Sequence, residues 1–165
     1  DDAMAVADRI AVMRAGRIVQ VGTPEEVYRA PIDRWVATLF ADLEEVSASV
    51  RGGRAETPLG SFAAPGLADG AALVCIRRDA FDLETEEPEF VARVLSTRFL
   101  GEHRTVTLAI DGLDRPSAAQ GDARRPVEGG ARIGVGLDRA EVFVFADESR
   151  IVDLPLLPNS ERVGI

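Results

Sequence analysis

A series of short apolar or alternating segments, separated by turn-forming residues, most strongly constrains the fold of this chain. It begins after Ala41 and continues for about 100 residues. Gly52-Gly53, Gly101-Glu102-His103 and Asp111-Gly112 have compositions typical of turns. The expected strands cover residues 46–50, 54–57, 72–77, 90–99, 104–110, 132–137 and 141–145. Roughly five to seven short strands in this arrangement predict a mainly β fold, built on a small, closed or nearly closed antiparallel β-barrel.

Residues 1–42 follow a different pattern, in which short helices and strands alternate. Residues 1–8 are expected to end a helix, while residues 9–13 and 18–21 should pair as a hairpin around Gly16. We therefore expect a short α/β segment ahead of the barrel.

The run Thr23-Pro24-Glu25-Glu26 is the strongest local signal for a helix start. Its threonine can cap the helix, its proline suits the first helical position, and its second glutamate can complete a capping box. The helix should end near Pro31, because the residue before a proline disfavours helical torsion angles. Asp33 is the expected cap of a second helix, whose apolar face runs from Trp35 to Phe40.

Two segments lack a clear period and are expected to be loose. They are residues 113–130 and the tail from Glu148 onward. The patterns together divide the chain into an α/β segment at 1–42, a barrel at 43–147 and a flexible tail at 148–165.

The charge of the chain argues against several classes of partner. The formal net charge is −9, and all 19 basic residues are arginine. A protein of this charge repels phosphate backbones, and its 5% aromatic content is low for an OB-fold that stacks on bases. We therefore expect no nucleic-acid partner. The sequence also lacks an apolar run of about 20 residues, the length that spans a bilayer as a helix.

Arg77 and Arg78 are the candidate ligand-binding residues, because paired guanidinium groups can hold an oxyanion. The alternative is that these arginines pair with nearby acids such as Asp79 and Asp82. Acid–base pairs among Asp79, Asp82 and Glu84 would have no accompanying nucleophile or metal-ligand triad, so we predict neither a catalytic nor a metal site.

Other residues with chemical potential have simpler interpretations. Cys75 lies in an apolar run and is expected to be a buried, unreactive thiol. His103 is expected in a turn, and residues 84–89 in a solvated acidic loop. The sequence has no lysine and thus no phosphate-binding loop of the Gly-x-x-x-x-Gly-Lys type. We therefore predict that this chain neither binds nor hydrolyses ATP and needs no cofactor of its own.

The first part of the chain resembles the ATP-binding subunits of ABC importers. The resemblance rests on Ala7-Asp8-Arg9-Ile10-Ala11-Val12-Met13, on the run from Gly16 to Tyr28, and on Ala30-Pro31 with Asp33-Arg34-Trp35. It is similar to the branch that handles ferric iron, polyamines and sugars. In that family the switch histidine would lie three residues before Asp1, so the resemblance implies a piece of a longer protein.

The later part resembles the TOBE domain of the same proteins, an OB-like barrel. The matching runs are Thr57-Pro58-Leu59-Gly60, Val74-Cys75-Ile76-Arg77, Leu100-Gly101-Glu102 and Gly130-Ala131-Arg132-Ile133. Arg77-Arg78-Asp79 stands where the family usually has Arg-Pro-Glu.

The resemblance implies a C-terminal regulatory and dimerisation domain of an importer ATPase, with ferric iron as the favoured solute. The parent protein would use ATP and Mg²⁺. Its partners would be a second copy, the nucleotide-binding domain and the membrane permease, at the cytoplasmic face of the bacterial plasma membrane. The alternatives are a stand-alone barrel that binds a small oxyanion, and a polyamine or sugar importer subunit.

Overall fold

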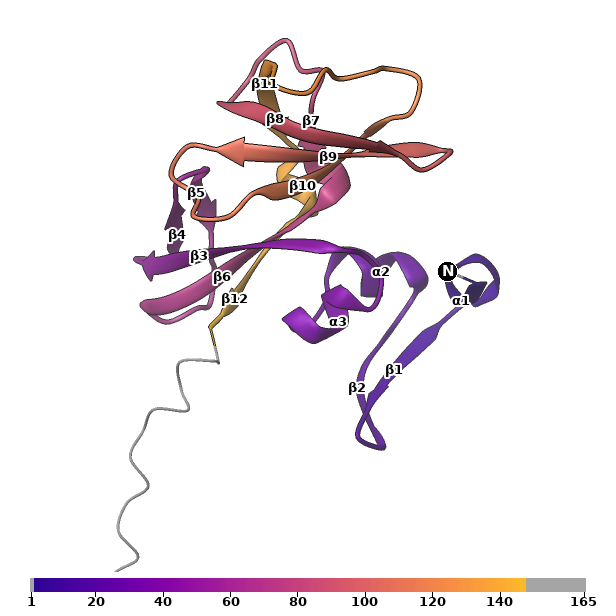
Figure 1. Ribbon diagram of the computed structural model, residues 1–165. Helices are drawn as coiled ribbons and strands as arrows, with labels where there is room; N and C mark the ends of the chain where they lie inside the picture. The colour runs from indigo at the N-terminus through magenta and orange to yellow at the C-terminus, as the bar shows by residue number, and fades with distance from the viewer. Residues whose placement is uncertain (1, 148–165) are drawn as a thin grey trace, which may run out of the picture.

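Short elements form the first part of the chain in the computed structural model, which describes residues 2–147 (Figure 1). They are α1 (Asp2–Val6), β1 (Ile10–Arg14), β2 (Arg17–Gly22), α2 (Pro24–Arg29) and α3 (Arg34–Thr38). β1 and β2 pair as an antiparallel hairpin, as predicted. Its turn uses Ala15 and Gly16, with φ angles of 51° and 76°. Because two successive positive φ angles match the twist of a tight hairpin, glycine at the second position lowers the cost of this turn.

The predicted capping box at the start of α2 is present. The Glu26 backbone N–H donates to Thr23 Oγ1 at 3.2 Å, and the Thr23 N–H donates to Glu26 Oε2 at 2.8 Å. Asp33 caps α3 by accepting a hydrogen bond from the Val36 N–H at 2.9 Å. α3 ends at Thr38, before the predicted end at Phe40. At this end the Leu39 N–H donates to the Val36 carbonyl, which tightens the last turn.

Two five-stranded antiparallel sheets form the second part. Their strands are β3 (Leu43–Arg51), β4 (Arg54–Thr57), β5 (Gly60–Ala63), β6 (Gly70–Arg77), β7 (Phe81–Asp82), β8 (Phe90–Phe99), β9 (His103–Ile110), β10 (Ser117–Asp122), β11 (Arg132–Leu137) and β12 (Val142–Ala146). Two single-turn helices accompany them, η1 (Arg78–Ala80) and η2 (Arg139–Glu141).

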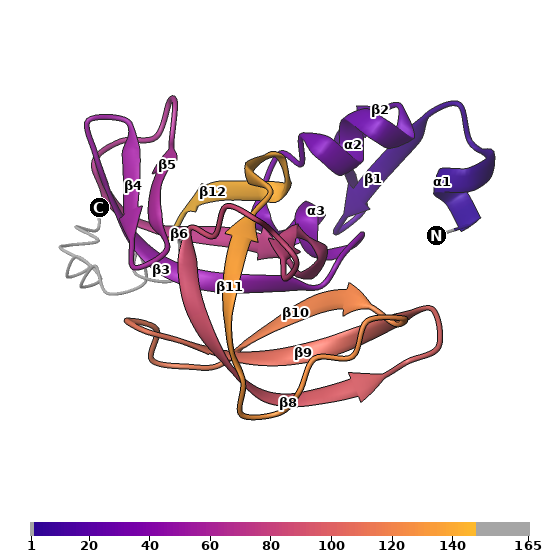
Figure 2. The same ribbon diagram turned by 90° about the horizontal axis from the view of Figure 1, so that it is seen from above.

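The order of the strands produces a nearly closed barrel. One sheet has the order β10-β9-β8-β11-β7, and β7 with η1 lies beside β10 at its other end. The second sheet has the order β12-β6-β3-β4-β5 and packs against the first, as Figure 2 shows. The expected mainly β fold, an antiparallel barrel preceded by a short α/β segment, is confirmed.

Both sheets contribute side chains to one apolar core. Along each strand, successive side chains alternate between the sheet face that is turned to this core and the opposite face. Phe62 and Phe81 are among the side chains that fill the core. Seven positions are predicted from the pattern to point inward. Five of them are buried, namely Val46, Val74, Ile76, Val94 and Leu108. Ile133 and Val142 are partly buried and pack against the same core.

The prediction that residues 113–130 are loose is wrong for β10. This strand pairs with β9 over its whole length, with Ala119 opposite Val106. Ala119 is fully buried. The sequence of β10 is rich in alanine and glycine, which have low strand propensity, so its structure depends on a neighbouring strand that local pattern cannot reveal. β5 and β7 are also absent from the predicted strands, and the tail from Glu148 lies outside the described residues.

The α/β segment covers part of the outer face of the second sheet, the face turned away from β8, β9 and β10 (Figure 2). Val74 and Ile76 of β6 point to the core, so their neighbours Leu73, Cys75 and Arg77 point to this outer face. Among residues 2–147, no helix is long and apolar enough to cross a membrane.

Candidate functional site

Arg77, the last residue of β6, is buried where the α/β segment meets the second sheet. Its side chain is only 1% exposed. The guanidinium carbon lies 3.4 Å from the ring centroid of Tyr28 in α2 and 4.9 Å from that of Phe143 in β12. A planar cation placed between two aromatic faces gains from both ring quadrupoles, most strongly when water is excluded.

The polar partners of Arg77 join three elements. Its Nη1 donates to Glu141 of η2, and the two side chains form an ion pair. Its Nη2 donates to the Tyr28 backbone carbonyl at 2.6 Å. That carbonyl lies in the last turn of α2, where no intrahelical N–H is available to it. The charge of Arg77 is therefore compensated, while its Nε is buried without a hydrogen-bond partner among the described residues.

Arg78 points to a different set of partners. Its Nη1 lies 2.7 Å from Asp42 Oδ2, and its Nε lies 3.1 Å from Glu44 Oε1. The acids that pair with Arg77 and Arg78 are therefore Glu141, Asp42 and Glu44, in place of the expected Asp79 and Asp82. The anion site at Arg77 and Arg78 stays a prediction, and the geometry gives the two guanidinium groups separate environments.

A further ion pair connects α3 to β3. Arg34 Nε lies 2.7 Å from Glu45 Oε1. Arg34, Arg77 and Arg78 together link residues before Leu43 to the sheet that follows. We call this set, with Tyr28, Asp42, Glu44, Glu45, Glu141 and Phe143, the junction.

Burial changes the acidity of two groups at the junction. It raises the pKa of the Tyr28 hydroxyl, an effect that nearby Arg77 opposes and Asp79 reinforces. It also raises the pKa of the Cys75 thiol to about 12, with a smaller contribution from the negative charge of Glu45. The predicted burial of Cys75 is confirmed. Its thiol stays protonated at neutral pH and is a poor nucleophile.

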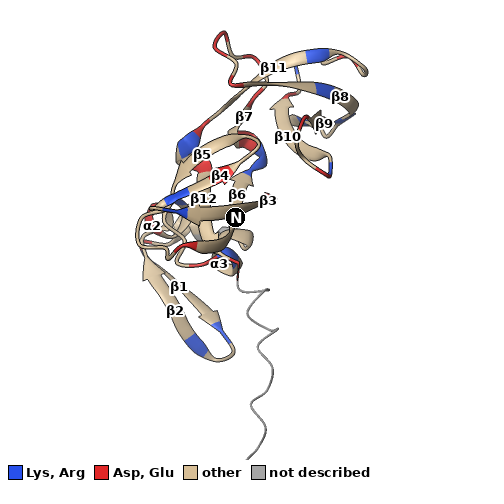
Figure 3. Ribbon diagram, turned by 90° about the vertical axis from the view of Figure 1, so that its left-hand side faces the viewer, with Lys and Arg blue, Asp and Glu red and all other residues tan. Residues whose placement is uncertain are grey.

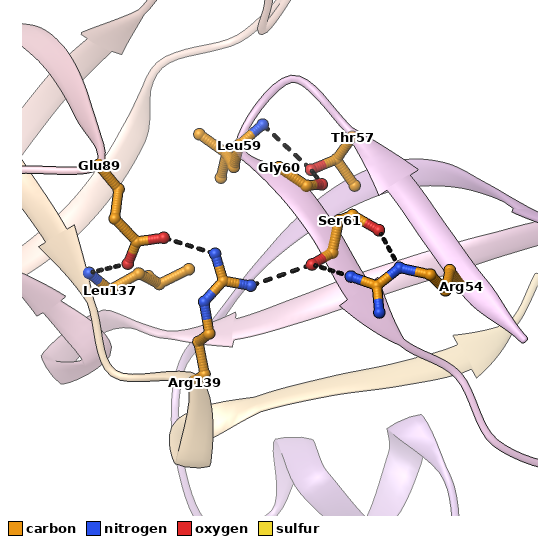
Figure 4. A network of polar contacts seen from close by, with 8 residues as sticks. All are labelled: Arg54, Thr57, Leu59, Gly60, Ser61, Glu89, Leu137 and Arg139. Carbon is orange, nitrogen blue, oxygen red and sulfur yellow. Dashed lines mark hydrogen bonds and ion pairs between the residues drawn. The ribbon is translucent and has the colours of Figure 1, made fainter.

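A second polar network ties the two sheets together around Arg139 of η2 (Figure 4). Arg139 pairs with Glu89, donates to the Ser61 carbonyl at 3.0 Å, and lies 4.9 Å from the Phe62 ring centroid. Glu89 in turn accepts from the Leu137 N–H at 3.2 Å. These contacts fix β11 and η2 against β5, which is a structural role.

A metal site would need a cluster of ligating side chains, and a nucleotide site of the phosphate-loop type would need its lysine. Residues 2–147 contain no group of three or more His, Cys, Asp or Glu side chains that could hold a metal ion. The whole sequence lacks the lysine that a phosphate-binding loop requires. His103 is the first residue of β9, beside the expected turn, and lines a small hollow of about 260 Å³ with Tyr28, Asp42 and Asp79.

Sequence reasoning identified Arg77 but missed the residues around it. Glu141 and Tyr28 lie 64 and 49 positions away in the sequence. No local pattern could connect them. Side chains two residues apart in a strand lie on the same face, so the sequence of β6 does indicate that Arg77 lies on the same face as Cys75, opposite the core.

Comparisons with known proteins show what the chain is similar to. A family model described as the TOBE domain matches residues 74–145. The Fe(3+) ions import ATP-binding protein FbpC of Streptomyces coelicolor is 38% identical over 145 residues, which cover 87% of this chain and 41% of that protein. The sn-glycerol-3-phosphate import ATP-binding protein UgpC 1 of Rhizobium johnstonii is 32% identical over 182 residues, covering 98% and 47%.

A third relative matches a shorter stretch. The sulfate/thiosulfate import ATP-binding protein CysA 2 of Chromobacterium violaceum is 50% identical over 54 residues, which cover 33% of this chain and 15% of that protein. The chain spans less than half the length of each of these relatives. It carries a TOBE domain and matches the TOBE-bearing part of the ATP-binding subunits of ABC importers, which confirms the recognition made from its sequence.

Proposed function

We propose that this chain is the C-terminal regulatory and dimerisation part of an ABC-importer ATP-binding subunit. In this proposal, residues 1–42 are the tail of the ATP-binding domain, residues 43–147 form the regulatory barrel, and residues 148–165 are a separate tail. The ATP and Mg²⁺ would be held by the part of the parent protein that this chain does not include.

The junction is the observation that carries the regulatory role. Arg77 belongs to the barrel, yet its guanidinium is held by the Tyr28 ring and carbonyl from α2. Removing a buried charge from its partners costs several kcal/mol. A displacement of the barrel would therefore move α2 with it, and α2 lies in the segment that resembles the ATP-binding domain.

Ferric iron is the proposed solute. The support is that relatives from Streptomyces coelicolor and Streptomyces avermitilis, 38% and 36% identical, are both described as Fe(3+) ions import ATP-binding proteins. Other relatives are described as importing sn-glycerol 3-phosphate or sulfate and thiosulfate, so these solutes are the comparison arms of the test.

The proposed partners are a second copy, which would contact the barrel, and a membrane permease bound by the parent protein at the cytoplasmic face. The dimer is supported by large apolar side chains that are exposed on one hairpin of the barrel. They are Val91, Leu95, Phe99 and Leu100, from 43% to 62% exposed. Exposed apolar patches are common at protein interfaces.

Uptake measurements in the source bacterium test which solute the parent protein helps to import. Deleting the gene of the parent protein should abolish ferric iron uptake under iron limitation and leave uptake of sulfate, glycerol 3-phosphate, polyamines and sugars unchanged. A copy of the gene should restore iron uptake. Normal iron uptake together with loss of another solute would contradict the iron assignment.

ATPase activity of the purified full transporter tests the regulatory role. Arg77→Ala should alter the ATPase rate, because it separates the barrel from α2. Arg125→Ala is the matched control, since Arg125 and its partner Glu84 are 68% and 41% exposed and lie outside the junction, and it should leave the rate close to wild type. Equal rates for wild type and Arg77→Ala, with both proteins folded, would exclude coupling through this residue.

A further inference from the structure

The single-turn helix η2 carries one residue from each of the two polar networks described above. It follows β11 of the first sheet and leads into β12 of the second, as the passage between these strands in Figure 2 shows. Its first residue, Arg139, pairs with Glu89, and its last, Glu141, pairs with Arg77. Only Ala140 separates them, so two networks that reach different parts of the molecule share one short support.

Polar contacts, rather than apolar packing, hold η2 in place. None of its three residues is buried. The preceding Asp138 accepts a hydrogen bond from the Ala140 N–H at 3.0 Å, and its own N–H donates to the Ala80 carbonyl at 2.8 Å. Figure 3 shows residues of both charges around β5 and β12, the strands next to η2. Because residues in one polar network influence each other's energies, a change at one end of η2 should be felt at the other.

The Arg139 end of η2 follows the position of the first sheet. The Arg139 guanidinium lies between Glu89 and Ser61, as Figure 4 shows. Glu89 directly precedes β8, and its N–H donates to the Val135 carbonyl of β11 at 3.0 Å. The exposed apolar patch of the barrel begins at Val91, near the start of the same strand. A contact on this patch that shifts β8 would therefore move Glu89 and pull on Arg139.

The Glu141 end of η2 reaches α2 through two arginines. Arg77 joins Glu141 to the ring and carbonyl of Tyr28. Arg29, in the last turn of α2, has its Nη1 4.0 Å from Glu141 Oε1. The Glu141 side chain is only 17% exposed, so solvent screens its ion pair with Arg77 weakly. A displacement of Glu141 would therefore act on the last turn of α2.

We propose that η2 couples β8 of the barrel to α2, through Glu89, Arg139, Glu141 and Arg77. The inference rests on the proposed function, because it names the route by which a contact on the exposed barrel patch would reach the segment assigned to the ATP-binding domain. Each side-chain step of this route is an ion pair or hydrogen bond between described residues. Such contiguous polar contacts can carry coupling between sites, provided that the coupling is measured.

Amide hydrogen exchange in the full chain measures the coupling. The Ala30 N–H closes the last turn of α2 with a hydrogen bond of 2.9 Å and is the reporter. Glu89→Gln weakens the ion pair with Arg139 and should raise the exchange rate of this amide about 2- to 30-fold. Arg54→Gln is the matched control and should leave the rate unchanged. Arg54 donates to the same Ser61 carbonyl as Arg139, but its hydrogen bonds among the described residues stay within the β4–β5 hairpin.

A double-mutant cycle tests the route. Arg77→Lys keeps the positive charge but removes the planar group that contacts Tyr28, so it should itself raise Ala30 exchange. Adding Glu89→Gln to Arg77→Lys should then raise the rate by less than Glu89→Gln does alone. Unchanged Ala30 exchange in Glu89→Gln would overturn the proposal, as would effects that simply multiply in the double variant. An equal increase at the Val106 amide of β9 would also overturn it, because it would indicate general destabilisation.

These measurements use the chain alone, so they separate the coupling from the proposed function. An α2 that does not respond to Glu89→Gln would remove η2 as the route and leave the regulatory role to other contacts. A responding α2, together with unchanged ATPase activity of the Arg77→Ala transporter, would support the route through η2 and remove the proposed regulatory role.

Discussion

Arg77 and Arg78 are identical neighbours in sequence whose environments differ sharply. The Arg77 side chain is 1% exposed and its partner Glu141 is 17% exposed. Arg78 is 36% exposed, and its partner Asp42 is 76% exposed. Arg77 ends β6 while Arg78 begins η1, and only the fold shows which acids the two side chains meet. The sequence could therefore identify Arg77 as a candidate without identifying its role in the junction.

Substituting each arginine in turn should show that the buried charge contributes more to the free energy of unfolding than the more exposed one. Arg77→Ala removes the buried partner of Glu141, which then has only Arg29 at 4.0 Å, and it removes both aromatic contacts, so it should lower the free energy of unfolding by about 3–5 kcal/mol. Arg78→Ala should cost less, about 1 kcal/mol, because the Arg78 side chain is 36% exposed and solvent screens its ion pair with Asp42. Urea denaturation followed by circular dichroism measures both values. Similar losses at the two positions would contradict the assigned burial.

Cys75 should make stability depend on pH in the alkaline range. The thiol pKa is about 12 in the folded chain, against an ordinary value of 9.0. The unfolded chain therefore loses its proton first, so the stabilisation is complete below pH 9 and declines as pH rises toward 12. The slope should approach about 1.4 kcal/mol per pH unit.

Few other groups interfere with a measurement of the unfolding free energy against pH in this range. The sequence has no lysine and one tyrosine, Tyr28, whose pKa is also raised by burial. Comparing the slope with that of Cys75→Ala isolates the thiol, since Tyr28 is present in both proteins. Parallel curves of unfolding free energy against pH for the two chains would show that Cys75 does not titrate as proposed.

At the scale of elements, local signals predicted best where local interactions determine the structure. β8 and β11 have the bounds expected from their residues, and α2 begins at the predicted capping box. β10 could not be predicted in the same way, because its alanines and glycine acquire strand structure only through pairing with β9. The junction likewise depends on contacts between elements distant in sequence.

The capping box of α2 should contribute measurably to stability. Thr23→Ala removes the side-chain acceptor of the Glu26 N–H and should cost about 1 kcal/mol. Glu26→Ala removes the reciprocal acceptor, and the double variant should cost less than the two single losses combined if they act as one unit. Denaturation midpoints of the four proteins give this coupling. Strictly additive losses would mean that the two hydrogen bonds act independently.

At the scale of the whole molecule, the net charge of −9 opposes self-association, while the exposed apolar side chains of the barrel favour it. A two-fold dimer would use the same patch on both copies. Because dimerisation brings like net charges together, added salt should screen the repulsion and strengthen association. Contacts supplied by the rest of a transporter are missing from the isolated chain, so its affinity should be modest.

Sedimentation velocity across protein concentration and salt tests this balance. We expect a reversible monomer–dimer equilibrium that shifts toward dimer as salt rises from low to physiological levels. Phe99→Ser should weaken the dimer, because Phe99 belongs to the exposed barrel patch and is 62% exposed. Ile18→Ser is the control, since Ile18 is 60% exposed but lies on β2, outside the barrel. A monomer at hundreds of micromolar in moderate salt would rule out dimerisation of this chain. Weakening by Ile18→Ser, without an effect of Phe99→Ser, would place the interface outside the barrel.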